Sequence, residues 1–129
     1  MSTIFTKIIN GEIPSYKIAE NESFIAFLDA MPLVKGHTLV VPKKETDLIF
    51  DLETEEYKNL WGFAQEVAKK IKKAVPCVRV GVAVVGLEVP HAHIHLIPLN
   101  TVEEMNFRNE RLKLTDEEYK EIQKSIVNS

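Results

Sequence analysis

The sequence predicts an α+β fold with a mainly antiparallel five-stranded sheet, one long helix, a short N-terminal helix and a C-terminal helix. Several short apolar runs, rich in β-branched residues and separated by turn residues, are typical of hairpin-linked strands. Only one segment has the length and the periodicity of a crossover helix. Because parallel strands need such crossovers, a doubly wound parallel sheet is disfavoured.

The first half of the chain carries signals for a short helix and three strands. Residues 3–9 are predicted as the helix, which ends at the turn signal Asn10-Gly11. Residues 16–19 and 24–28 are expected to be two strands joined as a hairpin. The third strand is predicted over residues 37–41, and Pro42 stops it because proline has no N–H to donate.

The long helix is predicted over residues 54–74, where apolar residues follow one helical face. Thr54 is the expected N-cap, and Glu55 and Glu56 suit the positive end of the helix dipole. Trp61 is expected in the core rather than at a substrate site. The apolar face comprises Tyr57, Leu60, Trp61, Ala64, Val67, Ala68 and Ile71.

The second half of the chain is predicted to hold two more strands and a final helix. Residues 78–85 are rich in β-branched side chains and are expected to form a buried strand, with Cys77 as a small buried residue at its start. Residues 90–98 are expected to form the fifth strand. Thr115 to Glu118 match a capping box, which opens a helix through about Ile126.

Length and composition favour a soluble protein with a single domain over residues 1–129. Hydrophobic residues make up 45% of the chain and charged residues 27%, and the net charge of −3 gives no basic surface for nucleic acid or an acidic membrane. No secretory signal is recognised, and no apolar run approaches the ~20 residues that cross a bilayer. A single cysteine cannot form a disulfide within the chain. We therefore expect a cytoplasmic protein with no nucleic-acid or membrane partner.

Three of the four histidines stand at alternate positions, His91, His93 and His95. On a strand they share one face, while Ala92 and Ile94 point to the other. Imidazoles in such a row can attack phosphorus, neutralise charge on phosphoryl oxygens and move a proton to a leaving group. A metal site is the alternative, but the outer two histidines lie about 13–14 Å apart along an extended strand. One ion would therefore bind two of them plus donors from elsewhere.

Residues 90–98, which read Pro-His-Ala-His-Ile-His-Leu-Ile-Pro, resemble the signature of the histidine-triad (HIT) family. Three upstream blocks resemble that family in the right order: residues 4–14, which are similar to the opening of its Hint-like bacterial branch, residues 26–29 and residues 36–43. The resemblance covers about residues 3–99 and leaves the tail over residues 100–129 unmatched. It implies a HIT-like fold and a nucleotide-binding hydrolase or transferase that acts on the α-phosphate of nucleotide conjugates.

The resemblance also assigns roles to individual residues. His93 matches the family's nucleophile, which implies a nucleotidyl-histidine intermediate, and His91 and His95 would orient it and contact phosphate. His37 matches a fourth histidine beside the triad, and Asp29 matches the carboxylate that accepts hydrogen bonds from the ribose hydroxyls. The other nucleotide-binding positions that it implies are Phe5, Ile8, Phe27, Gly86, Glu88 and Val89. The family usually forms dimers by extending its sheet, so a homodimer is expected.

The sequence departs from the family pattern in two places. Thr3, Thr6 and Glu45 stand where many bacterial relatives hold zinc with two cysteines and a histidine, so no structural zinc site and no bound metal are expected. Glu88 stands where relatives tend to place amide or hydroxyl donors, and its carboxylate can only accept. One hypothesis is that this carboxylate meets a cationic leaving group such as an amine.

These observations predict a dimeric enzyme that hydrolyses purine nucleoside phosphoramidates or adenylylated conjugates and needs no cofactor. Two alternatives stay open at this point. The first is a nucleotide-binding protein with little turnover, and the second is a metal-binding protein that uses the histidines. The sequence does not predict the role of the tail after Asn100.

Overall fold

The computed structural model describes residues 3–129 and shows an α+β fold built on one antiparallel sheet. The strand order is β1-β2-β3-β5-β4, and every pairing is antiparallel. The strands are β1 (Lys17–Glu20), β2 (Phe24–Leu28), β3 (Thr38–Pro42), β4 (Arg79–Ala83) and β5 (Ile94–Leu99). The helices are α1 (Ile4–Ile9), α2 (Thr54–Ala74) and α3 (Asp116–Val127), with 3₁₀ turns η1 (Ile49–Asp51) and η2 (Val102–Met105). The predicted fold class is confirmed.

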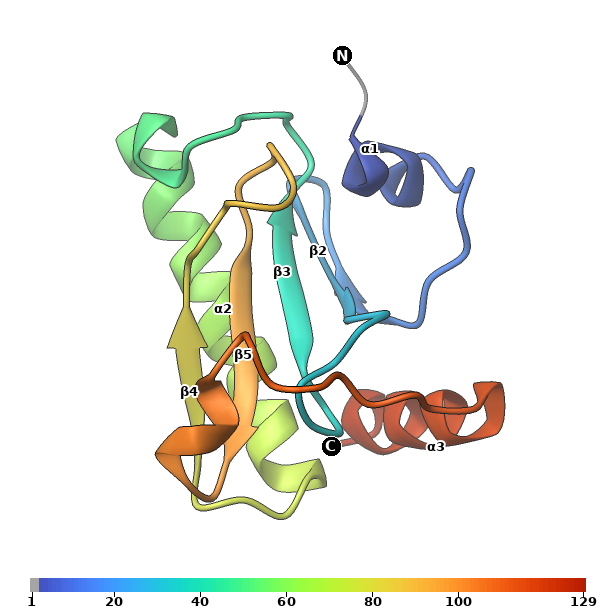
Figure 1. The fold of residues 1–129 in the computed structure, drawn as a ribbon. Helices are drawn as coiled ribbons and strands as arrows, with labels where there is room; N and C mark the ends of the chain where they lie inside the picture. Colours follow the sequence, from blue (N-terminus) through green and yellow to red (C-terminus); the bar gives the residue numbers. More distant parts are fainter. Residues whose placement is uncertain (1–2) are drawn as a thin grey trace.

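The sheet separates two apolar clusters of different size. Figure 1 shows α2 behind the sheet, where its buried residues form the main core with β2, β3 and β5. On the opposite face, α1 covers a smaller cluster over β2 and β3. The segment from η2 to α3 crosses in front of the sheet on that second face (Figure 1). Within residues 3–129, no helix is both long and apolar enough to span a bilayer.

The pairing register decides which side chains of β3 and β5 face each cluster. Val40 pairs with Ile94, and both side chains belong to the main core under α2. Leu39 pairs with His95, so this histidine points to the opposite face, which also carries Phe27. The predicted separation of a histidine from its apolar neighbour on the strand is therefore confirmed for His95 and Ile94.

The helix boundaries agree with the sequence except at one cap. The helix over residues 54–74 is confirmed, and so is the capping box, in which Thr115 and Glu118 each accept a hydrogen bond from the other's backbone N–H. The prediction that Thr54 caps α2 is wrong. Glu53 is the N-cap, with extended backbone, and its side chain makes no capping bond. Thr54 already has helical backbone in the first turn, so its hydroxyl is not placed over the free N–H groups of that turn as an N-cap side chain is.

The predicted buried strand over residues 78–85 is shorter and more exposed than expected. The observed β4 is the outer strand beside β5, and Val82 is 48% exposed. An edge strand has one neighbour only, so β-branched composition alone did not distinguish it from a buried strand. The prediction that Cys77 is buried is also wrong, because it lies half-buried in the loop before β4.

The fifth strand begins later than predicted, at Ile94 rather than residue 90. Upstream of it, the Ala92 N–H donates to the carbonyl of Thr46 at 2.7 Å instead of joining the ladder of β3. The His91 N–H is held by the carbonyl of Val89 at 2.8 Å. Both bonds remove donors that a strand would use, so His91 and His93 lie in an irregular segment that leads into β5.

Candidate active site

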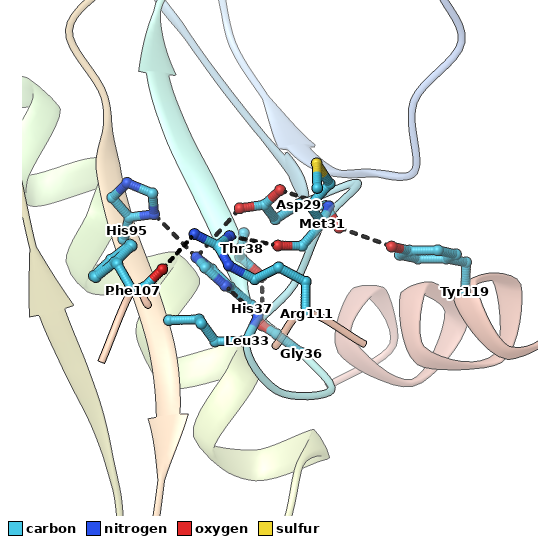
Figure 2. A network of polar contacts seen from close by, with 10 residues as sticks. All are labelled: Asp29, Met31, Leu33, Gly36, His37, Thr38, His95, Phe107, Arg111 and Tyr119. Atoms are coloured by element: carbon cyan, nitrogen blue, oxygen red, sulfur yellow. Dashed lines mark hydrogen bonds and ion pairs between the residues drawn. The ribbon is translucent and has the colours of Figure 1, made fainter. Parts of the chain in front are cut away.

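His37 and His95 form a buried pair at the centre of the sheet. His37 directly precedes β3, and a left-handed turn at Gly36 (φ +94°) brings the chain into that strand. The Nε2 atom of His37 lies 3.0 Å from Nδ1 of His95 and 3.4 Å from a carboxylate oxygen of Asp29 (Figure 2). His37 is fully buried and His95 is 8% exposed. The four predicted partners His37, His95, His93 and Asp29 therefore converge.

The hydrogen bonds around His37 determine where its proton lies. The backbone N–H of Leu33 donates to Nδ1 of His37 at 3.0 Å, so Nδ1 is an acceptor and the neutral ring carries its proton on Nε2. That N–H then donates to Nδ1 of His95. Since Nδ1 of His95 accepts, the His95 proton lies on its Nε2 atom. His95 therefore presents an N–H donor to the site.

Burial keeps the histidines of this site neutral. It lowers the pKa of His37 to about 3, and the nearby His95 and Arg111 lower it in the same direction. Burial also lowers the pKa of His95 to about 3, assisted by His93 and Arg111. The pKa of His93 is likewise lowered by burial, against an opposing effect of its hydrogen bond to the backbone. At neutral pH these imidazoles therefore carry no charge.

His93 has the opposite tautomer. Its Nδ1 atom lies 2.7 Å from the carbonyl oxygen of His91, which can only accept, so Nδ1 carries the proton and Nε2 has a bare lone pair. The ring is packed edge-on against Phe5 and His95, at centroid distances of 4.9 Å each. These contacts hold the ring plane while leaving Nε2 unprotonated. An imidazole nitrogen in this state is a nucleophile.

Both ring nitrogens of His91 are bound to groups other than the three remaining histidines. Its Nε2 donates to the carbonyl of Pro42 at 2.8 Å, so in the neutral ring Nδ1 accepts from the Thr3 hydroxyl at 3.0 Å. Thr3 and Thr6 form the capping box of α1, and the Thr6 hydroxyl donates to Glu45 at 2.7 Å. That hydrogen bond lowers the pKa of the Glu45 carboxyl. The three positions predicted to lack zinc thus lie together and are linked by hydrogen bonds beside His91.

The Nε2 atoms of His93 and His95 make no hydrogen bond within the described residues, although both side chains are buried. Among the described residues, Trp61 Nε1 is the side-chain nitrogen or oxygen that is sealed from solvent without a hydrogen-bond partner. The Nε2 atoms of His93 and His95 also lack a partner but are not sealed. A ligand atom that binds either nitrogen would therefore displace no hydrogen bond within the described residues.

Asp29 has a structural and a polar role at the end of β2. One carboxylate oxygen accepts from the Met31 N–H at 2.9 Å, and the backbone carbonyl of Asp29 accepts from the Tyr119 hydroxyl at 2.9 Å (Figure 2). Burial raises the pKa of the carboxyl, and the Met31 N–H and Arg111 oppose that rise. The second carboxylate oxygen faces His37.

Most of the predicted apolar nucleotide-binding residues lie together beside the histidines. Phe5 and Phe27 meet edge-on at 5.7 Å, and Ile8 and Val89 pack against the same cluster. Gly86 has a left-handed backbone (φ +71°) in the exposed loop before the triad. Glu88, in the same loop, raises the pKa values of both Asp29 and His93 through its charge. It therefore lies close enough to act on the site.

Two residues of the tail join the site and were missed by the sequence analysis. The Phe107 ring lies edge-on against His95 at 4.8 Å and against His37 at 6.4 Å. The Arg111 guanidinium lies next to them, over the Phe107 ring (Figure 2). Nothing in the periodicity of residues 100–114 indicates these contacts, because the segment forms neither a long helix nor a strand.

Asp29, His37 and His95 also offer three ligand atoms within 4.8 Å of one another, a spacing that suits a metal ion. The hydrogen bonds disagree with that role. A metal would bind Nε2 of His37, but this atom carries the proton because Leu33 donates to Nδ1. If the proton moved to Nδ1 of His37, this N–H and the Leu33 N–H would face each other as two donors without an acceptor. The donor set therefore does not fit a metal ion.

Comparison with known proteins gives consistent matches over most of the chain. A family model described as the HIT domain matches residues 10–102. An uncharacterized HIT-like protein of Borreliella burgdorferi is 33% identical over 131 residues, which cover 95% of this chain and 94% of that protein. An adenosine 5'-monophosphoramidase of Schizosaccharomyces pombe is 35% identical over 99 residues, which cover 76% of this chain and 74% of that protein.

The fold is also similar to a solved structure. A crystal structure of a HIT-like protein from Bartonella henselae matches with a TM-score of 0.84 at 33% sequence identity. The match covers 98% of this chain and 95% of that chain, so it includes the sheet, the three helices and the tail that crosses the histidines.

Proposed function

This chain belongs to the HIT family, and from its site we propose that it hydrolyses nucleotide conjugates, with purine nucleoside phosphoramidates or similar adenylylated compounds as substrates. The S. pombe relative is named an adenosine 5'-monophosphoramidase, which supports this substrate class. In this proposal His93 is the nucleophile, His95 is the proton donor, and His37 and His91 hold these two rings.

The proposal depends on one observation, the opposite tautomers of His93 and His95. His93 has a bare Nε2 atom because its proton is held by the His91 carbonyl. His95 carries its proton on Nε2 because its Nδ1 accepts from His37. The ring centroids of His93 and His95 are 4.9 Å apart. One substrate can therefore present its phosphorus to the bare nitrogen of His93 and its leaving group to the N–H of His95.

The proposed reaction has two steps. In the first, Nε2 of His93 attacks the α-phosphorus, the bond from phosphorus to the leaving nitrogen breaks, and that nitrogen takes the proton of His95. In the second, water attacks the phosphorus, the proton that this water loses returns to Nε2 of His95, and His93 and the nucleoside monophosphate are released. Burial lowers the pKa of His93, so its Nε2 atom is unprotonated and able to attack at neutral pH.

The base and the ribose have separate candidate contacts. We assign Asp29 to the ribose hydroxyls, because a carboxylate accepts from both hydroxyls of a diol. The apolar cluster of Phe5, Ile8, Phe27 and Val89 is assigned to the purine, next to His93. The Gly86 loop supplies backbone donors beside the phosphate, and Glu88 meets a cationic leaving group.

We further propose that a second copy of the chain pairs along β4. This strand is the outer strand of the sheet and exposes Val82 (48%) and the flanking Val84 (41%). An exposed apolar edge with free backbone donors and acceptors favours sheet extension. Analytical ultracentrifugation of the protein would show a dimer, and a charged residue in place of Val82 would weaken it.

Release of AMP from adenosine 5'-phosphoramidate tests the proposed function. The unaltered protein is expected to release AMP, and His93→Ala is expected to release at least about a thousandfold less while still binding AMP. If the unaltered protein binds AMP without turnover, it is a nucleotide-binding protein and the hydrolase proposal is wrong. Metal analysis of the purified protein tests the metal-binding alternative, which stoichiometric zinc would support.

A further inference from the structure

The segment 106–112 crosses the histidine face of the sheet as a strap between η2 and α3 (Figure 1). Its far end is fixed by the Leu112 N–H, which donates to the carbonyl of Pro32 at 2.9 Å. Its near end is a turn in which the Asn109 N–H donates to the Asn106 carbonyl at 3.0 Å. The strap is therefore held at both ends, and it carries Phe107 and Arg111 to the site.

The Arg111 guanidinium is oriented by backbone carbonyls on either side. One nitrogen donates to the carbonyl of Met31 at 2.7 Å, and another donates to the carbonyl of Phe107 at 3.2 Å (Figure 2). The central carbon lies 5.7 Å from the centre of the Phe107 ring, whose edge packs on His95. A guanidinium has five N–H donors, so three stay available to a ligand.

Arg111 has its charge unpaired although it is partly buried. Among residues 3–129, the ion pairs within 4.0 Å involve other cationic residues and not this one. Its charge nevertheless acts on the site, because it lowers the pKa values of Asp29, His37 and His95. A half-buried arginine that is oriented but unpaired is suited to binding an anion.

The charges of the site call for such a cation. His37, His93 and His95 are neutral near pH 7, since burial lowers all three pKa values. The carboxylates of Asp29 and Glu88 act on the same site. A bound nucleotide phosphate would add negative charge to a site in which neutral imidazoles supply hydrogen bonds but no positive charge. Arg111 is the cation that acts on both Asp29 and the histidine pair.

We propose that Arg111 forms an anion subsite that binds the phosphate of a nucleoside 5'-phosphate beside His93 and His95. This assignment rests on the proposed nucleotide function and adds a residue from the strap to it. The three available donors bind phosphoryl oxygens, while the Met31 and Phe107 carbonyls keep the guanidinium in place. The subsite recognises the phosphate and not the nucleoside.

Calorimetric titration with AMP and with adenosine tests this subsite directly. Arg111→Gln is expected to raise the dissociation constant for AMP about ten- to a hundredfold, the usual effect of losing charged hydrogen bonds, and to change that for adenosine by less than about twofold. Arg111→Lys keeps the charge without the planar fork and is expected to raise the AMP constant about three- to tenfold. Arg108→Gln removes an exposed arginine of the same strap and is expected to change neither constant.

Three results would overturn the subsite. Unchanged dissociation constants for both AMP and adenosine in Arg111→Gln would show that the arginine does not contact phosphate. Equal weakening of AMP and adenosine would show that the strap has a structural role only, and absence of AMP binding by the unaltered protein would remove the ligand altogether. If Arg111→Gln does not fold, the ratio measured for Arg111→Lys decides between the same outcomes.

The binding test is independent of turnover, so the two proposals can fail separately. A protein that prefers AMP through Arg111 but releases no AMP from the phosphoramidate would retain the subsite and lose the hydrolase assignment. A protein that hydrolyses the phosphoramidate while Arg111→Gln keeps its preference for AMP would retain the hydrolase assignment and lose the subsite.

Discussion

The two faces of the segment that holds the histidines are built from alternate residues and have different physical roles. On the α2 side, Ala92, Ile94 and Leu96 are buried in an apolar core, where the side chains need no hydrogen-bond partners. On the other side, His93 and His95 are almost as buried, but each nitrogen has a defined protonation state set by a neighbour. Burial stabilises the fold on one face, and on the other it sets tautomers and pKa values.

The largest effect on stability is expected from the α2 face. Ile94→Ala removes a fully buried side chain and should lower the free energy of unfolding by about 2–5 kcal/mol, because it loses apolar burial and leaves a cavity. Urea denaturation measures this loss. Leu87→Ala, at a position 88% exposed, is the control and should change stability by less than about 0.5 kcal/mol. Similar losses in both variants would contradict the assignment of Ile94 to the core.

Acid should act on the histidine face. His37 and His95 have folded-state pKa values of about 3, below the ordinary value of 6.5, so the unfolded chain binds more protons below pH 6.5 and stability falls as the pH decreases. Each histidine contributes about 1.4 kcal/mol per pH unit. The raised pKa of Asp29 acts in the opposite direction, and carboxyls with lowered pKa values contribute only below about pH 4.5.

Urea denaturation at pH 7, 6 and 5 checks this pH dependence. His37→Gln removes one of the three buried imidazoles whose pKa values are lowered, so the slope of stability against pH between pH 6 and 5 should fall by about a third to a half. A slope that is the same in this variant and in the unaltered protein would show that the buried pair does not cause the acid sensitivity.

A smaller effect is expected from the hydrogen bonds that hold His91. Thr3→Val removes the hydroxyl that donates to Nδ1 of His91, and through the His91 carbonyl it should loosen His93. We expect kcat to fall up to about tenfold with little change in KM. A factor of this size corresponds to the free energy of one neutral hydrogen bond. Steady-state kinetics with adenosine 5'-phosphoramidate measures it.

Two variants separate positioning from simple loss of a helix cap. Thr3→Ser keeps the hydroxyl and should retain kcat. Thr115→Val removes the equivalent capping box of α3, which touches no histidine, so it should lower stability by about 1 kcal/mol and leave kcat unchanged. An equal loss of kcat in both valine variants would assign Thr3 a structural role only.

The smallest effect is expected at the rim of the histidine face. Glu88 is exposed, and its charge is screened by solvent, so Glu88→Gln should lower turnover of lysine-like phosphoramidates only a few-fold. Turnover of conjugates with uncharged leaving groups should fall less. Equal changes for both substrate classes, measured as kcat/KM, would remove the idea that this carboxylate meets a cationic leaving group.

Local patterns were sufficient for most of the fold. The spacing of apolar residues over 54–74 predicted α2 with its observed bounds, and a capping box at Thr115 predicted the start of α3. The errors fell where burial depends on distant neighbours. The β-branched run of β4 was expected to be buried, but its position at the edge of the sheet was decided by the strand order.

The candidate site likewise contains residues that local patterns predict and residues that depend on contacts with distant parts of the chain. Alternation of His91, His93 and His95 predicted a shared face, and resemblance to a family supplied His37 and Asp29. Phe107 and Arg111 could not be predicted, because they contact residues far away in sequence and have no periodic pattern. The Arg111 side chain reaches the Met31 carbonyl across 80 positions of the chain.

The sequence by itself determined that three imidazoles alternate with apolar residues, and within β5 this alternation also fixes the face that each side chain takes. Only the tertiary structure decided which nitrogen of each imidazole carries the proton. That choice depends on the path that the backbone takes around each ring, which places the Leu33 N–H, the His91 carbonyl and the distant Pro42 carbonyl against ring nitrogens. A pattern of residue types does not contain these contacts, because the nearest polar atom is selected by packing.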